Sequence, residues 1–256
     1  MVFALVPGLS PLMGGIVADL AGWRNTFLVA GGLGVIVLAL VLWRLPETLP
    51  RDNMRTRSIG DLMQGYVEVL SSRRFRRYAL AGAFAMGGIF AFFGASPKIF
   101  IEILGVSPTE YGFYPPAAST GFIIGGAIVG RLIHRMTPQT ISGIGLAFFG
   151  IGVAIILLFS VFGPMTKYTL TLGVVVYVTG LGIFFPTAMA MAVMDFPHRA
   201  GTASAAMGFM QMGMAAVGAH LVGMLQADMP VMSMPIVMGV MASLALIIFF
   251  SHRRTV

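Results

Sequence analysis

The chain contains no cysteine and few charged side chains, and each shortage excludes a class of protein. Without cysteine there can be no disulfide and no thiolate metal site. Charged residues make up only 10% of the 256 residues, whereas a soluble domain carries about 25%. So few charges cannot cover a water-facing surface, while 57% of the residues are apolar and the mean hydropathy is +0.92. The composition therefore predicts an all-α integral membrane protein.

Long apolar runs predict a polytopic helix bundle of about eight transmembrane helices, because one span needs about 20 mostly apolar residues. The first run has no basic segment before it and is followed by more spans, so it does not have the pattern of a secretory signal. The predicted spans are Met1–Ala18, Asn25–Trp43, Tyr78–Ile101, Pro115–Ile133, Ile141–Phe162, Leu170–Met194, Thr202–Leu225 and Val231–Phe250.

The basic residues predict the orientation of these spans. With both termini and alternate loops in the cytoplasm, only Arg24, Lys98 and Lys167 of the 16 Lys and Arg residues lie outside. Basic residues in short loops stay cytoplasmic, so we expect a multi-pass protein of the inner (plasma) membrane with both termini inside. The net charge of +7 is then a topology signal, and nucleic acid is not expected as a partner. The other thirteen are Arg44, Arg51, Arg55, Arg57, Arg73, Arg74, Arg76, Arg77, Arg131, Arg135, Arg199, Arg253 and Arg254.

Residues 44–77 form the one sizeable stretch between spans, and an amphipathic helix is predicted within it. Ser58 and Asp61 have the spacing of a capping arrangement at its start. Two placements are open and compatible: the helix lies along the inner leaflet, attracted by anionic lipid, or it docks on the cytoplasmic ends of the spans. Its apolar stripe consists of Ile59, Leu62, Met63, Tyr66, Val67 and Leu70.

Enzyme signatures are missing from the sequence, and ionisable residues within the spans are few. No HExxH, CxxC or phosphate loop occurs, and no GxSxG has plausible partners, so no enzyme activity and no cofactor are expected. Lys98, Glu102 and His220 are the ionisable side chains placed within spans, and such residues are functional candidates. Lys98 and Glu102 also fit an interfacial pair, and His220 fits a hydrogen-bonded packing residue.

Aromatic and methionine side chains recur on faces of three spans together with one amide. Such surfaces suit a bulky apolar or cationic compound, although they are common in any membrane bundle. Pro186 removes a backbone donor within its span and predicts a kink, which can be a hinge or a fixed shape. The candidate substrate-cavity residues are Phe90, Phe93, Tyr177, Phe184, Met207, Gln211 and Met214.

Glycine and proline mark two further motifs. In the first span, Pro7 and Pro11 predict a bent helix, because the carbonyls four residues earlier lose their donors. Gly8, Gly14 and Gly15 accompany them, and this set fits either a functional motif or ordinary small-residue packing. Further on, Gly121, Gly125, Gly126 and Gly130 form two overlapping small-xxx-small pairs, which predict close helix packing.

Several short motifs, in order over nearly the whole chain, resemble one transporter family. Pro7 to Gly15 resembles the antiporter motif in helix five of major facilitator drug exporters, and Leu45-Pro46-Glu47-Thr48-Leu49 resembles the end of helix six. Gly94 to Pro97, Gly105 to Pro108, Phe185 to Ala188 and Arg199 to Ala205 resemble helices seven, ten and eleven of the bicyclomycin-resistance (Bcr/CflA) branch.

The resemblance implies a division of the chain, since that family has twelve spans in two six-helix halves. Residues 1–45 would be the last two helices of the N-terminal half, 46–77 the cytoplasmic linker and 78–256 the six-helix C-terminal half. The chain would thus be the C-terminal two-thirds of a twelve-helix fold. Gly130, Arg131 and Arg135 resemble a remnant of the family's loop motif, with His134 at its acidic position.

The function implied by the resemblance is proton-coupled efflux of drugs or small metabolites, a form of antibiotic resistance. The proton gradient would supply the energy, and the lipid bilayer, a small-molecule substrate and the missing N-terminal helices would be the partners. No carboxylate lies mid-span, so the proton-binding group would belong to the missing helices. Two alternatives stay open: a membrane-inserted remnant that transports nothing, and an exporter of one specific metabolite.

Overall fold

The computed structural model describes residues 13–14, 16–17, 20–46 and 58–251, and throughout these residues the regular structure is helical. Six of the described helices are long and apolar enough to cross a membrane. These observations confirm the predicted all-α polytopic membrane fold. The helices are α2 (Trp23–Arg44), α3 (Ile59–Ser71), α4 (Arg73–Pro97), α5 (Pro108–Tyr111), α6 (Tyr114–Leu132), α7 (Pro138–Val161), α8 (Lys167–Val193), α9 (Ala200–Leu225) and α10 (Ser233–Ser251), with a π-helix at Lys98–Ile103 and a 3₁₀ turn at Pro197–Arg199.

Most predicted spans match a helix to within three residues, and α4 is the exception. It begins at Arg73, where the Ser72 hydroxyl accepts a hydrogen bond from the Phe75 amide at 3.3 Å, and not at Tyr78 as predicted. An arginine-rich first turn can extend a membrane helix because long side chains reach the interface. The first predicted span falls mostly outside the described residues.

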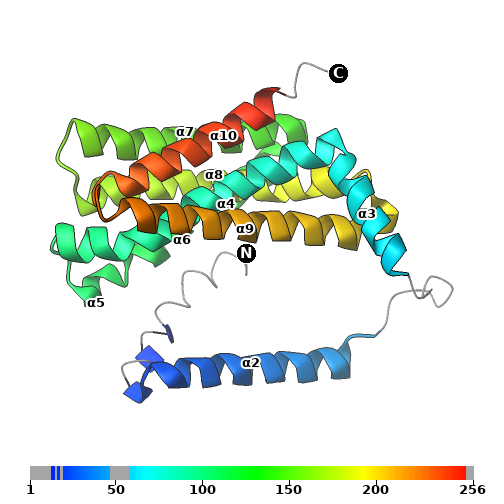
Figure 1. Cartoon of the computed structure of the whole chain (residues 1–256), viewed down its shortest axis with the longest axis horizontal. Coiled ribbons are helices and arrows are strands. Elements are labelled where there is room, and N and C mark those ends of the chain that lie inside the picture. The colour runs from blue at the N-terminus through cyan, green and yellow to red at the C-terminus, as the bar shows by residue number, and fades with distance from the viewer. Residues whose placement is uncertain (1–12, 15, 18–19, 47–57, 252–256) are drawn as a thin grey trace.

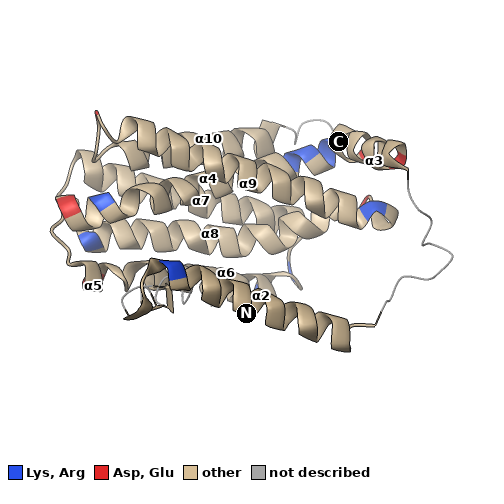
Figure 2. Cartoon of the chain, turned by 60° about the horizontal axis from the view of Figure 1, so that its bottom comes forward, with Lys and Arg blue, Asp and Glu red and all other residues tan. Residues whose placement is uncertain are grey.

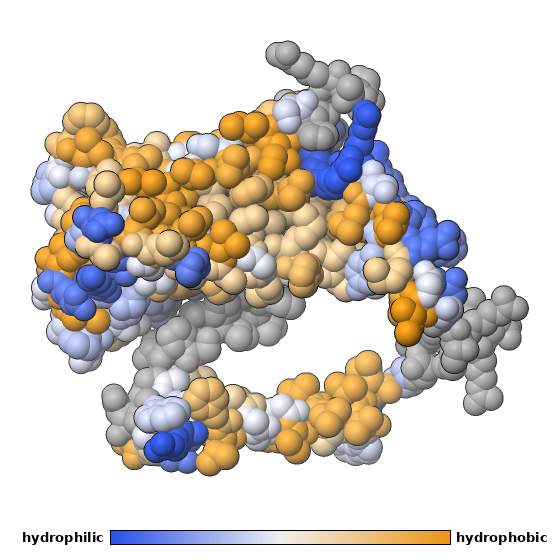
Figure 3. Space-filling view, in the orientation of Figure 1, coloured by the Kyte–Doolittle hydropathy of each residue, from blue (hydrophilic) through white to orange (hydrophobic). Residues whose placement is uncertain are grey.

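The helices from α4 to α10, except the short α5, form one bundle in which α8 is central (Figure 1). Helix α8 packs against α6, α7 and α4, and α4 in turn packs against α9 and α10. Charged residues gather at the two ends of the bundle and leave the middle uncharged (Figure 2). Apolar side chains cover the flank between these ends (Figure 3). This distribution is that of a bundle surrounded by lipid.

Glycines set the distances between α8 and its neighbours. A Cβ built on Gly125 of α6 would lie 2.3 Å from the Thr179 carbonyl oxygen, and one built on Gly145 of α7 would lie 2.9 Å from the Gly180 carbonyl oxygen. Close packing was therefore predicted correctly for Gly121 and Gly125. It was wrong for Gly126 and Gly130, which have no described atom within 4 Å, because they do not lie on the α6 face that meets α8.

Helices α2 and α3 differ in how they join the bundle. No residue of α2 is buried, and the helix lies apart from the others (Figure 1). In α3 the predicted capping box is present, with the Ser58 amide donating to Asp61 at 3.1 Å. Glu68 of α3 pairs with Arg199 at 3.2 Å, so the helix docks on the start of α9. The apolar side chains Ile59, Met63 and Val67 stay 79%, 59% and 62% exposed, which leaves them available to a membrane surface.

Candidate functional site

Three of the predicted cavity residues converge on one glycine of α4. The position of a Cβ on Gly82 lies 3.4 Å from Phe184 of α8 and 3.6 Å from both Met207 and Gln211 of α9. Phe184 and Met207 are buried, whereas Gln211 is half-buried. Within the described structure Gln211 makes no side-chain hydrogen bond. The site thus presents one unpaired amide between an aromatic ring and a thioether, at the junction of α4, α8 and α9.

Tyr177 lies further along the same junction and is fully buried. Its hydroxyl donates a hydrogen bond to the Ala85 carbonyl at 2.8 Å, and its ring stacks on Phe149 with centroids 4.9 Å apart. The hydroxyl also lies directly over Gly88, where a Cβ would be only 2.2 Å away. This side chain joins α8 to α4, and in this conformation it presents no open surface.

Phe90, Phe93 and Met214 continue the site toward the other end of α4. The rings of Phe90 and Phe93 meet edge to face with centroids 5.9 Å apart, and Phe93 is 40% exposed. Met214 packs against Gly87, with its Cγ 3.0 Å from the position of a Cβ. All seven predicted residues therefore lie on α4, α8 and α9, with Phe93 exposed, and their role in binding stays a prediction.

The predicted ionisable residues lie at the edge of this region. Lys98 and Glu102 both belong to the π-helix that follows Pro97. Lys98 is half-buried, and Glu102 is exposed. Both residues lie in the described part of the chain, and they do not form an ion pair there. His220 is exposed on α9. None of the three contacts the Gly82 site.

The remaining motifs are placed as follows. Four residues of the antiporter motif lie outside the described residues: Pro7, Gly8, Pro11 and Gly15. The fifth, Gly14, has no described atom within 4 Å of its Cβ position. Pro186 is exposed within α8, which is continuous through it, so its role as a hinge stays a prediction. The loop-motif residues Gly130, Arg131 and Arg135 are exposed at the end of α6.

Two polar clusters were missed by the sequence reasoning. At the arginine-rich end, the guanidinium of Arg77 is buried over the ring of Phe249, 4.0 Å from its centroid. At the other end, Lys167 donates to Glu110 Oε1 at 2.7 Å and Tyr114 donates to the same oxygen at 2.8 Å. Arg77 and Phe249, and likewise Glu110 and Lys167, are far apart in the chain; the spacing of four between Glu110 and Tyr114 is the one local signal.

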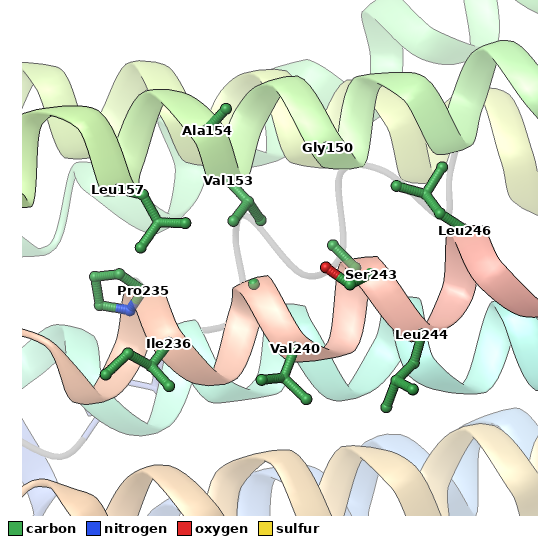
Figure 4. Close-up of a pocket in the computed structure, with 12 residues that line it drawn as sticks. Gly150, Val153, Ala154, Leu157, Pro235, Ile236, Val240, Ser243, Leu244 and Leu246 are labelled. Carbon is green, nitrogen blue, oxygen red and sulfur yellow. The ribbon is translucent and has the colours of Figure 1, made fainter.

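A separate apolar pocket of about 560 Å³ lies between α7 and α10. Val153 and Leu157 of α7 point across it toward α10, where Pro235 lies opposite Leu157 (Figure 4). Ser243 is the polar side chain among its lining residues. A ligand site needs a few converging polar groups to orient its ligand, so this pocket is a weaker candidate than the Gly82 site.

Comparison with known proteins decides the family. Residues 1–219 match the sequence profile of the Major Facilitator Superfamily. This chain belongs to the Major Facilitator Superfamily.

Relatives within the superfamily include named resistance proteins. The chain is 28% identical to an uncharacterized MFS-type transporter YdgK of Bacillus subtilis over 96% of its own length and 61% of that protein. It is 26% identical to a bicyclomycin resistance protein homolog of Haemophilus influenzae over 89% of its length and 57% of that protein. It is 28% identical to the multidrug transporter MdfA of Yersinia pestis over 85% of its length and 53% of that protein. The chain thus spans little more than half the length of these superfamily relatives.

Proposed function

We propose that this chain is part of a proton-coupled exporter of drugs or small metabolites from the Bcr/CflA branch. Membership of the superfamily supports transport. The names of two relatives, a bicyclomycin resistance protein homolog and a multidrug transporter, support efflux as its direction. The exporter would lie in the inner membrane, and the distribution of arginines supports cytoplasmic termini.

The Gln211 amide carries the proposal for the substrate site. It lies near the middle of α9, meets Gly82 together with Phe184 and Met207, and makes no side-chain hydrogen bond to a described residue. An amide held in an apolar membrane region without a partner is unfavourable, and a substrate with a hydrogen-bonding group would satisfy it. Phe184 and Met207 would add adaptable apolar contact, which suits compounds of varied shape.

The greater length of the relatives supports the proposed domain division. Residues 1–45 would be helices five and six, 46–77 the linker, and 78–256 the second six-helix half. Among the described residues, the acidic side chains lie near helix ends or between helices, as Glu110 and Asp195 do. The proton-binding carboxylate would therefore come from the helices that precede residue 1 in the full exporter.

A substitution of the amide tests the substrate site. In a version joined to the preceding helices, Gln211→Leu should change the relative resistance to different drugs by about tenfold while the amount of protein stays the same. Loss of one hydrogen bond to a substrate group is worth about 1 to 2 kcal/mol. Met212→Leu, at an exposed neighbour on α9, is the matched control and should change nothing. An unchanged drug profile for Gln211→Leu would remove the amide from the site.

Reporter fusions test the orientation. Fusions after Arg135 and Arg199 should report the cytoplasm, and fusions after Gly105 and Lys167 should report the outside, because arginines are retained on the cytoplasmic face. Two or more reversed results would exclude the proposed topology.

A further inference from the structure

Two adjoining pockets lie at the end of the bundle opposite the arginine-rich end, and they differ in polarity. The first, of about 490 Å³ between α6 and α8, is almost wholly apolar and is lined by Phe113, Tyr114, Leu172 and Val175 among others. The second, of about 330 Å³, has both polar and apolar walls and includes Gly105, Thr166 and Lys167. Glu110 and Tyr168 line both pockets. The two therefore form one continuous site with an apolar part and a polar part.

Opposite charges stand at the junction between the two parts. Lys167 and Glu110 form an ion pair at 2.7 Å, with side chains 32% and 42% exposed. The hydrogen bonds from Lys167 and Tyr114 hold the pKa of Glu110 below its ordinary value, so the carboxylate is ionised at neutral pH. Charged residues of both signs are visible beside α5 in Figure 2.

The ion pair leaves part of each group unused. Both hydrogen bonds to Glu110 end on Oε1, and Oε2 accepts none within the described structure. Lys167 donates one of the three N–H groups of its ammonium to Glu110. A ligand with one cationic donor and one anionic acceptor could therefore bind Oε2 and the remaining N–H groups without breaking the pair.

The apolar part of the site requires that the ligand also carry an apolar chain. Tyr168 and Val175 line the apolar part along α8, and seven residues of helix correspond to about 10 Å. Aromatic side chains at its mouth are typical of the boundary between membrane and water. A ligand for the whole site has a zwitterionic head at this boundary and a hydrocarbon chain that runs into the bilayer.

We propose that this site binds a phospholipid with a primary-ammonium headgroup, phosphatidylethanolamine, from the surrounding leaflet. The ammonium donates to Glu110 Oε2, the phosphate accepts from Lys167, and one acyl chain fills the apolar part beside Leu172 and Val175. Phosphatidylcholine is bound less well because its quaternary ammonium has no N–H to donate. The inference does not depend on the proposed transport function, since binding is measured on the chain itself.

The experiment uses native mass spectrometry of the purified 256-residue chain, with dioleoyl phosphatidylethanolamine, phosphatidylcholine or phosphatidylglycerol added to the micelles. Retention of phosphatidylethanolamine should be about fivefold greater than retention of either of the others, which is the effect of one well-placed ionic hydrogen bond at a partly exposed site. Equal retention of the three lipids by the unmodified chain would overturn the proposal.

Two variants distinguish recognition of the lipid headgroup from binding of its acyl chain. Glu110→Gln should abolish the preference for phosphatidylethanolamine over phosphatidylcholine. Val175→Trp leaves the ion pair intact and should lower retention of all three lipids by filling the apolar part. The matched control replaces Lys98 and Glu102 by glutamine, since these residues carry the same charges at the same end without forming a pair, and it should change nothing. A preference that survives Glu110→Gln, or an equal loss in the control, would contradict the assignment.

Discussion

Two glycines of α4 face side chains of the predicted cavity, but they leave very different amounts of space. A Cβ on Gly82 would make ordinary contacts of 3.4 to 3.6 Å with Phe184, Met207 and Gln211. A Cβ on Gly88 would lie 2.2 Å from the Tyr177 hydroxyl, which is held by its hydrogen bond to Ala85. The pair therefore distinguishes the tightly packed part of the junction from the looser part.

We predict that Gly88→Ala lowers the thermal unfolding midpoint of the purified chain and that Gly82→Ala leaves it nearly unchanged. Overpacking a filled site costs about 1 to 3 kcal/mol, and loss of the Tyr177 hydrogen bond adds to this. The midpoint can be followed by light scattering or dye binding in detergent. Equal shifts for the two variants would show that Tyr177 moves aside without cost, contrary to the packing described here.

The sequence offered candidate cavity residues, but not which of them meet across helices or how deeply they lie. Spacing within single helices grouped Phe184 with Tyr177, and Met207 with Gln211; the structure places Phe184, Met207 and Gln211 together beside Gly82. Burial of Tyr177 could not be foreseen, because it depends on Gly88 and Ala85 of another helix, 89 and 92 positions earlier. Periodicity within one helix contains no information on the neighbour that it meets.

At the level of helices, α3 shows what the hydrophobic pattern determines and what it leaves open. The stripe and the Ser58 cap predicted a helix, and both are present. The pattern could not show which residues of the helix would meet the bundle. That contact is made by Gly65 and Glu68, which meet Arg199, a residue more than 130 positions later in the chain.

We predict that Gly65→Leu detaches α3 from α9. A Cβ at this position would lie 2.6 Å from a guanidinium nitrogen of Arg199, so a leucine cannot be accommodated without moving the arginine away from Glu68. Trypsin should then cut faster at Arg73 and Arg74, which follow α3. Gly60→Leu is the matched control on the same helix, because the nearest atom to a Cβ there is the Ser58 hydroxyl at 3.6 Å. Identical cleavage rates for the two variants would rule out this mode of docking.

At the level of the whole molecule, α2 and the six-helix bundle have unequal surroundings. Every described residue of α2 is partly or fully exposed, and its glycines Gly31, Gly32 and Gly34 have no described atom within 4 Å of their Cβ positions. In membranes such small-residue faces pack against other helices. The helical bundle was predictable from hydropathy, but the partner of α2 was not; of the eight predicted spans, six correspond to described helices that are long and apolar enough to cross a membrane.

We predict that residues 1–256 expressed alone give no drug resistance. Alternating access requires two halves that move around a shared site, and in the proposed domain division this chain would supply one such half and two helices of the other. The chain should insert into the membrane, be degraded quickly, and confer no resistance in a drug-sensitive cell. Co-expression of the first four helices of a relative provides the positive control. Robust efflux by the purified chain in liposomes would overturn the prediction, unless two copies assemble.

The glycine contacts of α8 also affect how the bundle can move. Where carbonyl groups of α6 and α7 rest against bare Cα atoms of α8, a slide by one residue would place a side chain on each contact point. The three helices are therefore held in a fixed register and should move together as one rigid body during a transport cycle. Because the chain has no cysteine of its own, spin labels on single cysteines added to α6 and α7 can measure this directly. Their separation should stay constant while the distance from α2 changes.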